Sequence, residues 1–321
     1  MTTLELLQSN LLSPVVLCFV LGVVASMLKS DLELPDAFVT ALSIYLLLAI
    51  GLKGGVELRQ ASLGALVKPI LVTLALGCAI PVWSYAVLRW PGKFAVADAA
   101  AVAAHFGSCS VVTFIAATTF LQTAGRPVEG FMPALVAIME VPAIVVALMI
   151  ARTRMQTQGS WGKILHEVFA GRSVLLLVGG LAIGYAAGPA GFAPVKLLFV
   201  DAFRGVLCLF LLELGIKAAS RMGDLKRTGL FLVVFSIVMP LLHGGLGVWL
   251  GLLCGMSVGG ATVLGTLAAS ASYIAAPAAV RIALPEANPA YYLTASLAVA
   301  FPFNLAVGIP LYYRFAELLA G

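Results

Sequence analysis

Apolar residues follow one another in long runs along this chain, and short clusters of charged residues separate the runs. An apolar helix of about 20 residues is long enough to cross the hydrocarbon core of a bilayer. The pattern therefore predicts an all-α polytopic membrane protein without a separate soluble domain. We place its ten spans at residues 11–28, 36–56, 64–88, 96–121, 131–151, 173–191, 197–216, 229–253, 260–282 and 290–313.

The composition agrees with this prediction and argues against other classes of protein. Hydrophobic residues make up 62% of the chain and charged residues 10%, whereas a soluble domain carries roughly 25% charged residues. The net charge of +5 comes from basic residues between the spans. We interpret it as a determinant of topology and not as a nucleic-acid contact. The five cysteines show no metal-ligand spacing and are interpreted as packing residues.

The chain divides into two similar halves. The longest polar connection, residues 152–172, separates five spans in residues 1–151 from five in residues 173–321. Residues 51–55 (Gly-Leu-Lys-Gly-Gly) and 215–219 (Gly-Ile-Lys-Ala-Ala) each end the second span of their half, at an offset of 164 residues (215 minus 51). An odd number of spans per copy turns the second copy upside down in the membrane. The halves therefore predict a 5+5 inverted repeat.

Lys and Arg residues gather on one side of the predicted topology. If the N-terminus is outside, twelve of them lie inside and seven outside. Because basic residues are enriched in cytoplasmic loops, we predict that both termini are outside and that residues 152–172 are cytoplasmic. The expected location is the cell inner (plasma) membrane.

A short polar motif occurs twice, each time inside an apolar span. Residues 107–113 read Gly-Ser-Cys-Ser-Val-Val-Thr in the fourth span, and residues 269–277 read Ala-Ser-Ala-Ser-Tyr-Ile-Ala-Ala-Pro in the ninth. Polar interruptions in corresponding spans of two halves are typical of a transporter's binding site. In hydrocarbon, an opened backbone is tolerated only where it lines a cavity or is buried in protein. Small and hydroxyl residues also allow close helix packing, and that alternative stays open.

Broken helices at these motifs would attract both an anion and a cation. Gly107 weakens its helix, and Pro277 removes a backbone donor. The half-helix N-termini would offer N–H groups to an anion, and freed carbonyl and hydroxyl oxygens would suit a hard cation such as sodium. The predicted substrate-binding residues are Gly107, Ser108, Ser110, Thr113, Ser270, Ser272 and Tyr273.

Two further polar residues occupy matching positions in the fifth and tenth spans. These are Glu140 and Asn304, again at an offset of 164 residues (304 minus 140). A charge at mid-bilayer costs at least about 2.5 kcal/mol. We therefore predict that Glu140 and Asn304, together with Ser110 and Ser272, bind a cation or carry a proton. A carboxylate held by helix ends for structural reasons is the alternative. Glu213 is equally deep in the seventh span, but no partner is expected for it.

The sequence contains none of the common enzyme motifs. There is no nucleophile elbow, zinc-protease motif, phosphate-binding loop or dinucleotide fingerprint. We therefore expect a protein that is not an enzyme. Without a nucleotide site, transport would be passive or driven by an ion gradient.

Seven short motifs follow one another along the whole ten-span body. They are residues 51–55, Met-Glu-Val-Pro-Ala at 139–143, Phe-Arg-Gly at 203–205, Ser-Arg-Met-Gly-Asp-Leu at 220–225, Ala-Ala-Ser at 268–270, Arg281, and Pro-Glu-Ala-Asn-Pro at 285–289. Together they resemble the SbtA-type sodium-dependent bicarbonate transporter family. The resemblance implies core and gate domains, crossed broken fourth and ninth helices, and a homotrimer. It also implies elevator-type alternating access with bicarbonate and sodium at the crossing, and a PII-like regulatory protein on the cytoplasmic face.

The chain departs from the family pattern within the two polar motifs. Tyr273 replaces an acidic residue, and Val111 and Val112 replace Gly and Ser. Our interpretation is a bicarbonate importer coupled to sodium, with no cofactor other than that ion. The alternatives are a transporter of another small anion or carboxylate, coupled to protons through Glu140, and a membrane receptor that binds an anion without moving it.

Overall fold

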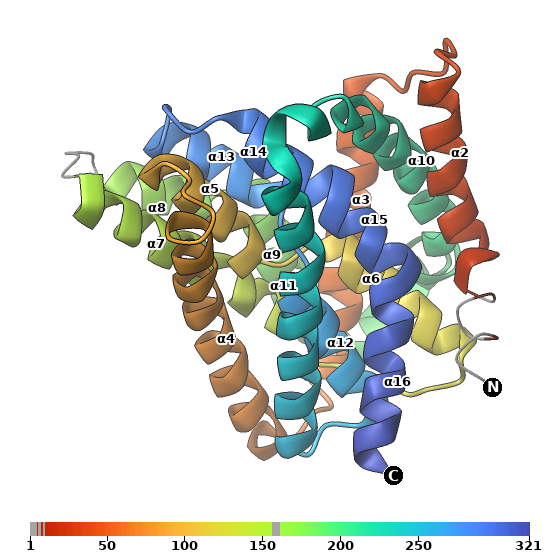
Figure 1. The fold of residues 1–321 in the computed structure, drawn as a ribbon. Helices are drawn as coiled ribbons and strands as arrows, with labels where there is room; N and C mark the ends of the chain where they lie inside the picture. Colours follow the sequence, from red (N-terminus) through yellow and green to blue (C-terminus); the bar gives the residue numbers. More distant parts are fainter. Residues whose placement is uncertain (1–4, 6–7, 9, 156–160) are drawn as a thin grey trace.

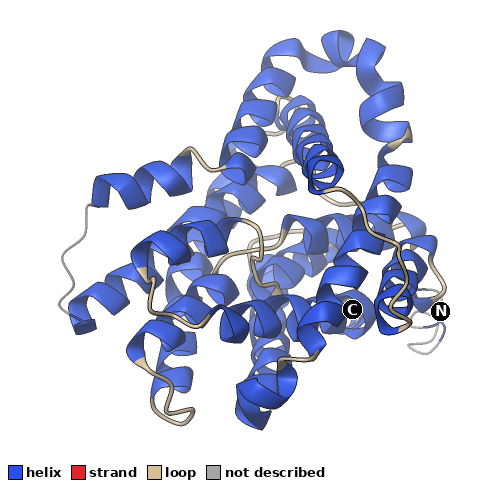
Figure 2. Cartoon of the chain, turned by 90° about the horizontal axis from the view of Figure 1, so that it is seen from above, coloured by secondary structure: helices blue, strands red, loops and turns tan. Residues whose placement is uncertain are grey.

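The computed structural model describes residues 5, 8, 10–155 and 161–321, and this part of the chain contains helices and loops without strands (Figure 2). The helices are α2 (Pro14–Met27), α3 (Asp36–Leu58), α4 (Leu63–Arg89), α5 (Val96–Gly107), α6 (Val111–Thr123), α7 (Met132–Met155), α8 (Trp161–Phe169), α9 (Arg172–Phe192), α10 (Phe203–Met222), α11 (Leu225–Leu253), α12 (Val258–Ala269), α13 (Ala275–Ala283), α14 (Pro289–Leu293), α15 (Phe301–Phe303) and α16 (Ile309–Ala320). A 3₁₀ turn (Ala193–Val195) and π-helical segments (Leu197–Asp201, Thr294–Ala300, Asn304–Gly308) complete the order.

Among the described residues, seven helical segments are long and apolar enough to cross a membrane. They are Asp36–Leu58, Gly64–Arg89, Val96–Thr123, Met132–Met155, Arg172–Val195, Thr228–Leu253 and Pro289–Ala320. These segments confirm a multi-pass membrane protein. The other three predicted spans correspond to α2 and α12, which are apolar but shorter, and to α10. Every 18-residue stretch of α10 holds at least three charged residues.

Two sequence-based boundaries differ from the structure. The predicted span at 197–216 is displaced, because Leu197–Asp201 forms a separate π-helical turn and α10 begins only at Phe203. The connection at 152–172 is mostly helical, since α7 continues to Met155 and α8 fills Trp161–Phe169; residues 156–160 of this prediction lie outside the described residues. Apolar residues recur at helical spacing along α8, which explains why it is an amphipathic helix and not a loop.

The helices form two groups. In the first, which we call the four-helix layer, α3 packs along α9 and α2 packs along α10. In the second, the broken-helix unit, α4 packs on α5 and α7 while α11 packs on α12 and α16. Figure 1 shows α2 and α10 side by side at one edge, with α4 near the opposite edge. The C-terminus lies at one end of the molecule and α8 at the other (Figure 1).

Glycines let the backbones approach closely within the four-helix layer. A Cβ atom on Gly51 would lie 2.8 Å from the Leu177 carbonyl oxygen and 2.9 Å from Gly180 Cα on α9. A Cβ atom on Gly215 would collide with the Phe19 carbonyl oxygen on α2. Each of the two Gly-x-Lys motifs therefore lies where two helices of the four-helix layer approach closely, α3 with α9 and α10 with α2.

Substitution of Gly51 by valine is expected to destabilise the protein by about 1–3 kcal/mol, the usual cost of forcing extra atoms into a packed interface. The new methyl groups have no space between α3 and α9. The matched control is Gly179→Val. Gly179 lies on α9, the helix against which Gly51 packs, but nothing lies within 4 Å of a Cβ atom at Gly179. Thermal unfolding in detergent measures both. Equal unfolding temperatures for the two variants would contradict the packing argument.

Carboxylates fasten the loops of the broken-helix unit at both ends. Glu129, between α6 and α7, accepts hydrogen bonds from the N–H (2.5 Å) and Oγ (3.1 Å) of Ser257, the N-cap of α12. Asp98, in the first turn of α5, accepts from the N–H of Asn288 (2.8 Å), the N-cap of α14. The first contact joins the loop after α6 to the start of α12. The second joins α5 to the start of α14. Each contact therefore connects one broken span to a segment at the end of the other.

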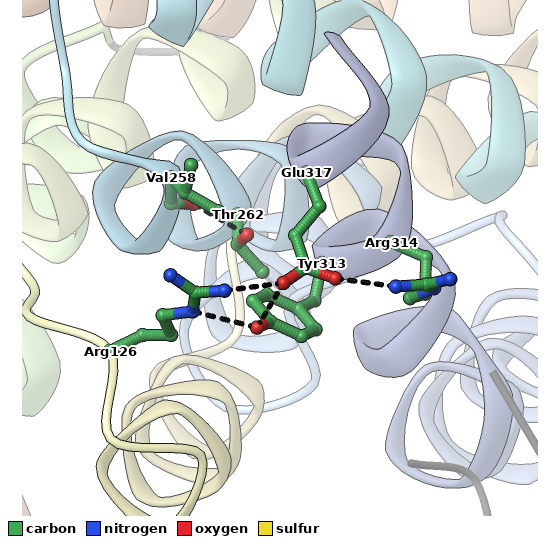
Figure 3. A network of polar contacts seen from close by, with 6 residues as sticks. All are labelled: Arg126, Val258, Thr262, Tyr313, Arg314 and Glu317. Carbon is green, nitrogen blue, oxygen red and sulfur yellow. Dashed lines mark hydrogen bonds and ion pairs between the residues drawn. The ribbon is translucent and has the colours of Figure 1, made fainter. Parts of the chain in front are cut away.

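A polar network anchors α16 to the loop that follows α6 (Figure 3). Arg126 donates from Nε to the Tyr313 hydroxyl (2.8 Å) and from Nη2 to Glu317 Oε1 (2.6 Å). Arg314 donates to Glu317 Oε2 (2.8 Å). The last helix is thereby fixed to the second half of the first broken span.

Candidate functional site

The first polar motif interrupts the fourth span between α5 and α6. Ser108 takes an extended conformation (φ −82°, ψ 162°), and Ser110 is the N-cap of α6, with its Oγ accepting from the N–H of Thr113 (3.2 Å). Gly107 ends α5 where a Cβ would lie 2.7 Å from Pro81 Cδ. Gly107 is thus required by close packing, and the serines end one helix and start the next.

The second motif interrupts the ninth span between α12 and α13 in the same way. Ser270 is extended (φ −78°, ψ 162°), and Ser272 Oγ accepts from the N–H of Ala276 (3.2 Å). Pro277 lies in the first turn of α13, where a missing N–H leaves no helical hydrogen bond unmade. Both interruptions therefore have a local cause in the sequence.

The tertiary structure joins the two interruptions directly. The Ser110 N–H donates to Ser270 Oγ (2.9 Å), and the Ser272 N–H donates to the His105 carbonyl oxygen (2.8 Å). Residues about 160 positions apart in the sequence thus share one buried site. We call residues 107–113 and 269–275 the crossing.

Four helix ends meet at the crossing. Helices α6 and α13 begin there, and the N–H groups of a first turn have no acceptor within their own helix. Helices α5 and α12 end there, and their last carbonyl groups lack intrahelical donors. Because a helix carries roughly +0.5 charge at its start and −0.5 at its end, the crossing presents positive and negative ends side by side. Such a site can hold an anion and a cation together.

Two of the predicted serines are occupied in holding this frame. Ser108 Oγ donates to the Glu140 carbonyl oxygen (3.3 Å). Ser270 Oγ donates to the Leu267 carbonyl oxygen (2.8 Å) while it accepts from Ser110. Their hydroxyl protons are therefore already used by the protein.

The other hydroxyl groups retain bonding capacity. Ser110 Oγ and Ser272 Oγ each accept a backbone N–H, so each keeps its own proton for a further acceptor. The Tyr273 hydroxyl is buried beside Ser110, and no described residue makes a regular hydrogen bond to it. Its ring packs edge-on against Phe301, with centroids 5.4 Å apart. These three side chains are available to a ligand.

Asn304 reaches the crossing. Its Nδ2 donates to the Ala269 carbonyl oxygen (2.9 Å) at the end of α12, and its Oδ1 accepts from the Tyr312 hydroxyl (2.9 Å). The residue starts a π-helical segment, a feature frequent at functional sites. Sequence reasoning found Asn304 through the repeat offset but missed both the π-helical geometry and Tyr312.

Glu140 touches the frame through its backbone only. Its carboxyl group lies close to Ser173, and its Oε2 atom is buried without a partner among the described residues. This carboxyl group lines a separate cavity. Glu213 was expected to have no partner, and that expectation is wrong: its Oε1 lies 3.2 Å from Lys217 Nζ, one helical turn away.

Two cavities approach the crossing from opposite sides. The α3–α6 cavity, about 450 Å³, lies between the four-helix layer and the broken-helix unit and extends to Phe114 and Ile115 on α6. The α9–α13 cavity, about 280 Å³, is lined by Glu140, by the start of α9 and by Ile274 and Ala275 at the start of α13. Sequence analysis did not identify either cavity, because each is formed by helices that are remote in the chain.

Two broken apolar helices, joined at their breaks and approached by cavities, define a membrane transport protein of the discontinuous-helix class. The family profile of the Na+-dependent bicarbonate transporter superfamily matches residues 14–317. The chain belongs to this superfamily, which confirms the resemblance seen in its motifs and indicates a membrane transporter of bicarbonate. A comparison with curated proteins gives no match.

Proposed function

We propose that this protein imports bicarbonate together with sodium by alternating access, and that the crossing is the binding site for both ions. The observation that carries the proposal is the direct hydrogen bonding of the two interruptions, Ser110 to Ser270 and Ser272 to His105. It places two helix starts, two helix ends and three unused hydroxyl groups in one buried volume.

Bicarbonate binds at the starts of α6 and α13. Backbone N–H groups there face an anion with the positive ends of both helices. Ser110, Ser272 and Tyr273 add hydroxyl donors. The remaining predicted residues shape the site: Gly107, Ser108, Thr113 and Ser270 set the backbone that presents these donors.

Sodium binds at the ends of α5 and α12, where carbonyl oxygens are the hard ligands that this ion prefers. Asn304 orients the last carbonyl group of α12, and Ser110 and Ser272 supply hydroxyl oxygens between the two ion positions. Tyr273 has no carboxylate to offer, so the protein ligands of sodium here are neutral oxygens.

The 5+5 inverted repeat and the alternating access follow from the arrangement of pairs. The pair α3 and α9 has its counterpart in α10 and α2, and α4 with α5 has its counterpart in α11 with α12. The broken-helix unit carries the crossing past the four-helix layer, which exposes it first to the α3–α6 cavity and then to the α9–α13 cavity. The resemblance adds a homotrimer and a PII-like cytoplasmic partner as further predictions, and the distribution of Lys and Arg adds that both termini lie outside.

Uptake of labelled bicarbonate into sealed vesicles tests the proposal. We expect that an inward sodium gradient accelerates uptake about tenfold or more over an equal potassium gradient, because a transporter that needs sodium at the crossing is mostly idle without it. Vesicles that lack the protein measure diffusion of carbon dioxide. Equal uptake with sodium and potassium would contradict sodium coupling.

Proton coupling is the second candidate, and one observation favours it. The Glu140 carboxyl group is buried and lines the α9–α13 cavity, where it can exchange a proton with water on that side. An imposed proton gradient, inside alkaline, would then drive uptake in the absence of sodium. Sodium-dependent uptake that ignores the proton gradient would exclude this candidate.

A further inference from the structure

The α9–α13 cavity brings together a carboxyl group, a guanidinium group and the starts of two helices. It lies between α7, α8, α9 and α13, on the side of the molecule opposite to the α3–α6 cavity. Arg172, the first residue of α9, lines the cavity and is exposed. Ser173 and Glu140 are buried in its wall.

Two helix starts face this one cavity. Helix α9 begins at Arg172 after the N-cap Gly171, and helix α13 begins at Ala275 after the N-cap Ile274; neither N-cap side chain accepts a hydrogen bond. Ser272 Oγ accepts a hydrogen bond from one first-turn group of α13, the N–H of Ala276. Because Pro277 has no N–H, the Ala275 N–H is the one left in the first turn of α13; it and the first-turn N–H groups of α9 have no acceptor within their own helices.

The charge at this place is unusual for a protein without a ligand. A cation in the first turn of a helix is unfavourable, because it meets the positive end of the helix dipole. Here Arg172 is the first residue of α9, and the cavity that it lines is also lined by Ile274 and Ala275 at the start of α13. Even with Glu140 ionised, two helix starts of roughly +0.5 each and one guanidinium sum to about +1 in total. A single monovalent anion neutralises that charge.

The Glu140 carboxyl group selects among such anions. Glu140 lines the cavity, and its Oε2 atom has no hydrogen-bond partner among the described residues, so this carboxyl group is the acceptor that we assign to a ligand with its own O–H group. Bicarbonate has oxygen acceptors for Arg172 and the N–H groups and one hydroxyl donor for Glu140. Nitrate has the acceptors and the same charge but no hydroxyl group.

We infer that the α9–α13 cavity is a second anion site, which binds bicarbonate between Arg172, the starts of α9 and α13, and the Glu140 carboxyl group. The inference rests on the proposed function, since the site lies next to the crossing at Ile274 and receives the anion when it leaves. It assigns Arg172 and Ser173 roles that the two polar motifs did not indicate. Ser173 lies close to the Glu140 carboxyl group in the cavity wall, and we assign it the role of positioning that group.

Protection of an introduced cysteine measures occupancy of this site without any transport. Ala278 lines the cavity and is exposed, so the variant Ala278→Cys is labelled with an anionic thiol reagent in detergent and read by peptide mass spectrometry. Bicarbonate, compared with equal chloride, is expected to slow labelling roughly tenfold at about ten times its Kd, because labelling requires the free site. Absence of protection would overturn the inference.

Arg172→Gln in this background is expected to raise the half-protecting concentration about tenfold or more, the effect of losing one charge-assisted hydrogen bond. Arg154→Gln is the matched control, because Arg154 is an exposed basic residue near the same end that does not line the cavity. Equal losses in both variants would mean general attraction by basic residues and would overturn the site.

Nitrate is expected to protect only at several-fold higher concentration than bicarbonate, and equal protection would remove Glu140 from the site.

The two proposals fail separately. Sodium-driven uptake without protection at position 278 would overturn the second site alone, whereas protection without sodium-driven uptake would overturn the proposed function alone.

Discussion

Replacement of Tyr273 by phenylalanine is expected to raise the KM for bicarbonate about 10- to 100-fold without lowering thermal stability. A hydrogen bond to a charged ligand contributes about 1.5–3 kcal/mol, and each 1.4 kcal/mol is about a factor of ten in affinity. The Tyr273 hydroxyl has no regular protein partner, so its removal breaks no bond within the fold. The ring and its contact with Phe301 stay in place.

Tyr313→Phe is the control for this prediction, because it should show the opposite behaviour. The Tyr313 hydroxyl is bonded to Arg126 and Glu317, away from the crossing (Figure 3). Its loss should weaken the anchoring of α16 slightly and leave the KM unchanged. Initial uptake rates over a range of bicarbonate concentrations and unfolding temperatures in detergent give both quantities. An unchanged KM for Tyr273→Phe would remove this hydroxyl from the binding site.

Replacement of Asn304 by alanine is expected to cost about 2–4 kcal/mol of stability and to abolish sodium-dependent uptake. The side chain is fully buried, and its loss leaves the Ala269 carbonyl oxygen without a donor, a penalty of about 1–3 kcal/mol. The volume vacated beside α12 adds a smaller term. Because Ala269 ends α12 at the crossing, its carbonyl group is no longer fixed where we propose that sodium binds.

Tyr312→Phe separates the two hydrogen bonds of Asn304. It removes the hydroxyl that bonds Asn304 Oδ1 and the Pro240 carbonyl oxygen, and it keeps the bond from Asn304 to Ala269. We expect this variant to cost about 1–3 kcal/mol, as the loss of a buried donor does, and to retain sodium-dependent uptake. If Tyr312→Phe lost sodium dependence as fully as Asn304→Ala, orientation of the Ala269 carbonyl group would not be the role of Asn304.

Sequence reasoning located the interruptions but could not assign the hydrogen-bonding role of each hydroxyl group. Ser108, Ser110, Ser270 and Ser272 are equivalent in the motifs. In the structure, two of them donate to backbone carbonyl groups and two keep their protons. The difference depends on which carbonyl group or N–H lies opposite each serine. That is fixed by neighbouring helices and not by local spacing.

The pairing of Glu140 with Asn304 was only half informative. Their offset predicts related positions in α7 and the last span, but one side chain reaches the end of α12 and the other lies close to Ser173 in the wall of the α9–α13 cavity. Related positions in a duplicated chain need not face the same neighbours. Helix α8 helps to line the cavity at Val168, although the sequence pattern predicts a connecting loop at residues 152–172.

By itself the sequence determined that this is an apolar helical protein, that two of its spans break at small hydroxyl residues, and to which family it belongs. These properties follow from hydropathy, helix capping and the conformational freedom of Gly and Ser, which act over a few residues. Only the tertiary structure decided that the breaks bond to each other and that Arg172 and Glu140 line one cavity. Such contacts join residues from distant parts of the chain, and their positions depend on how helices pack, as at Gly51 and Gly215.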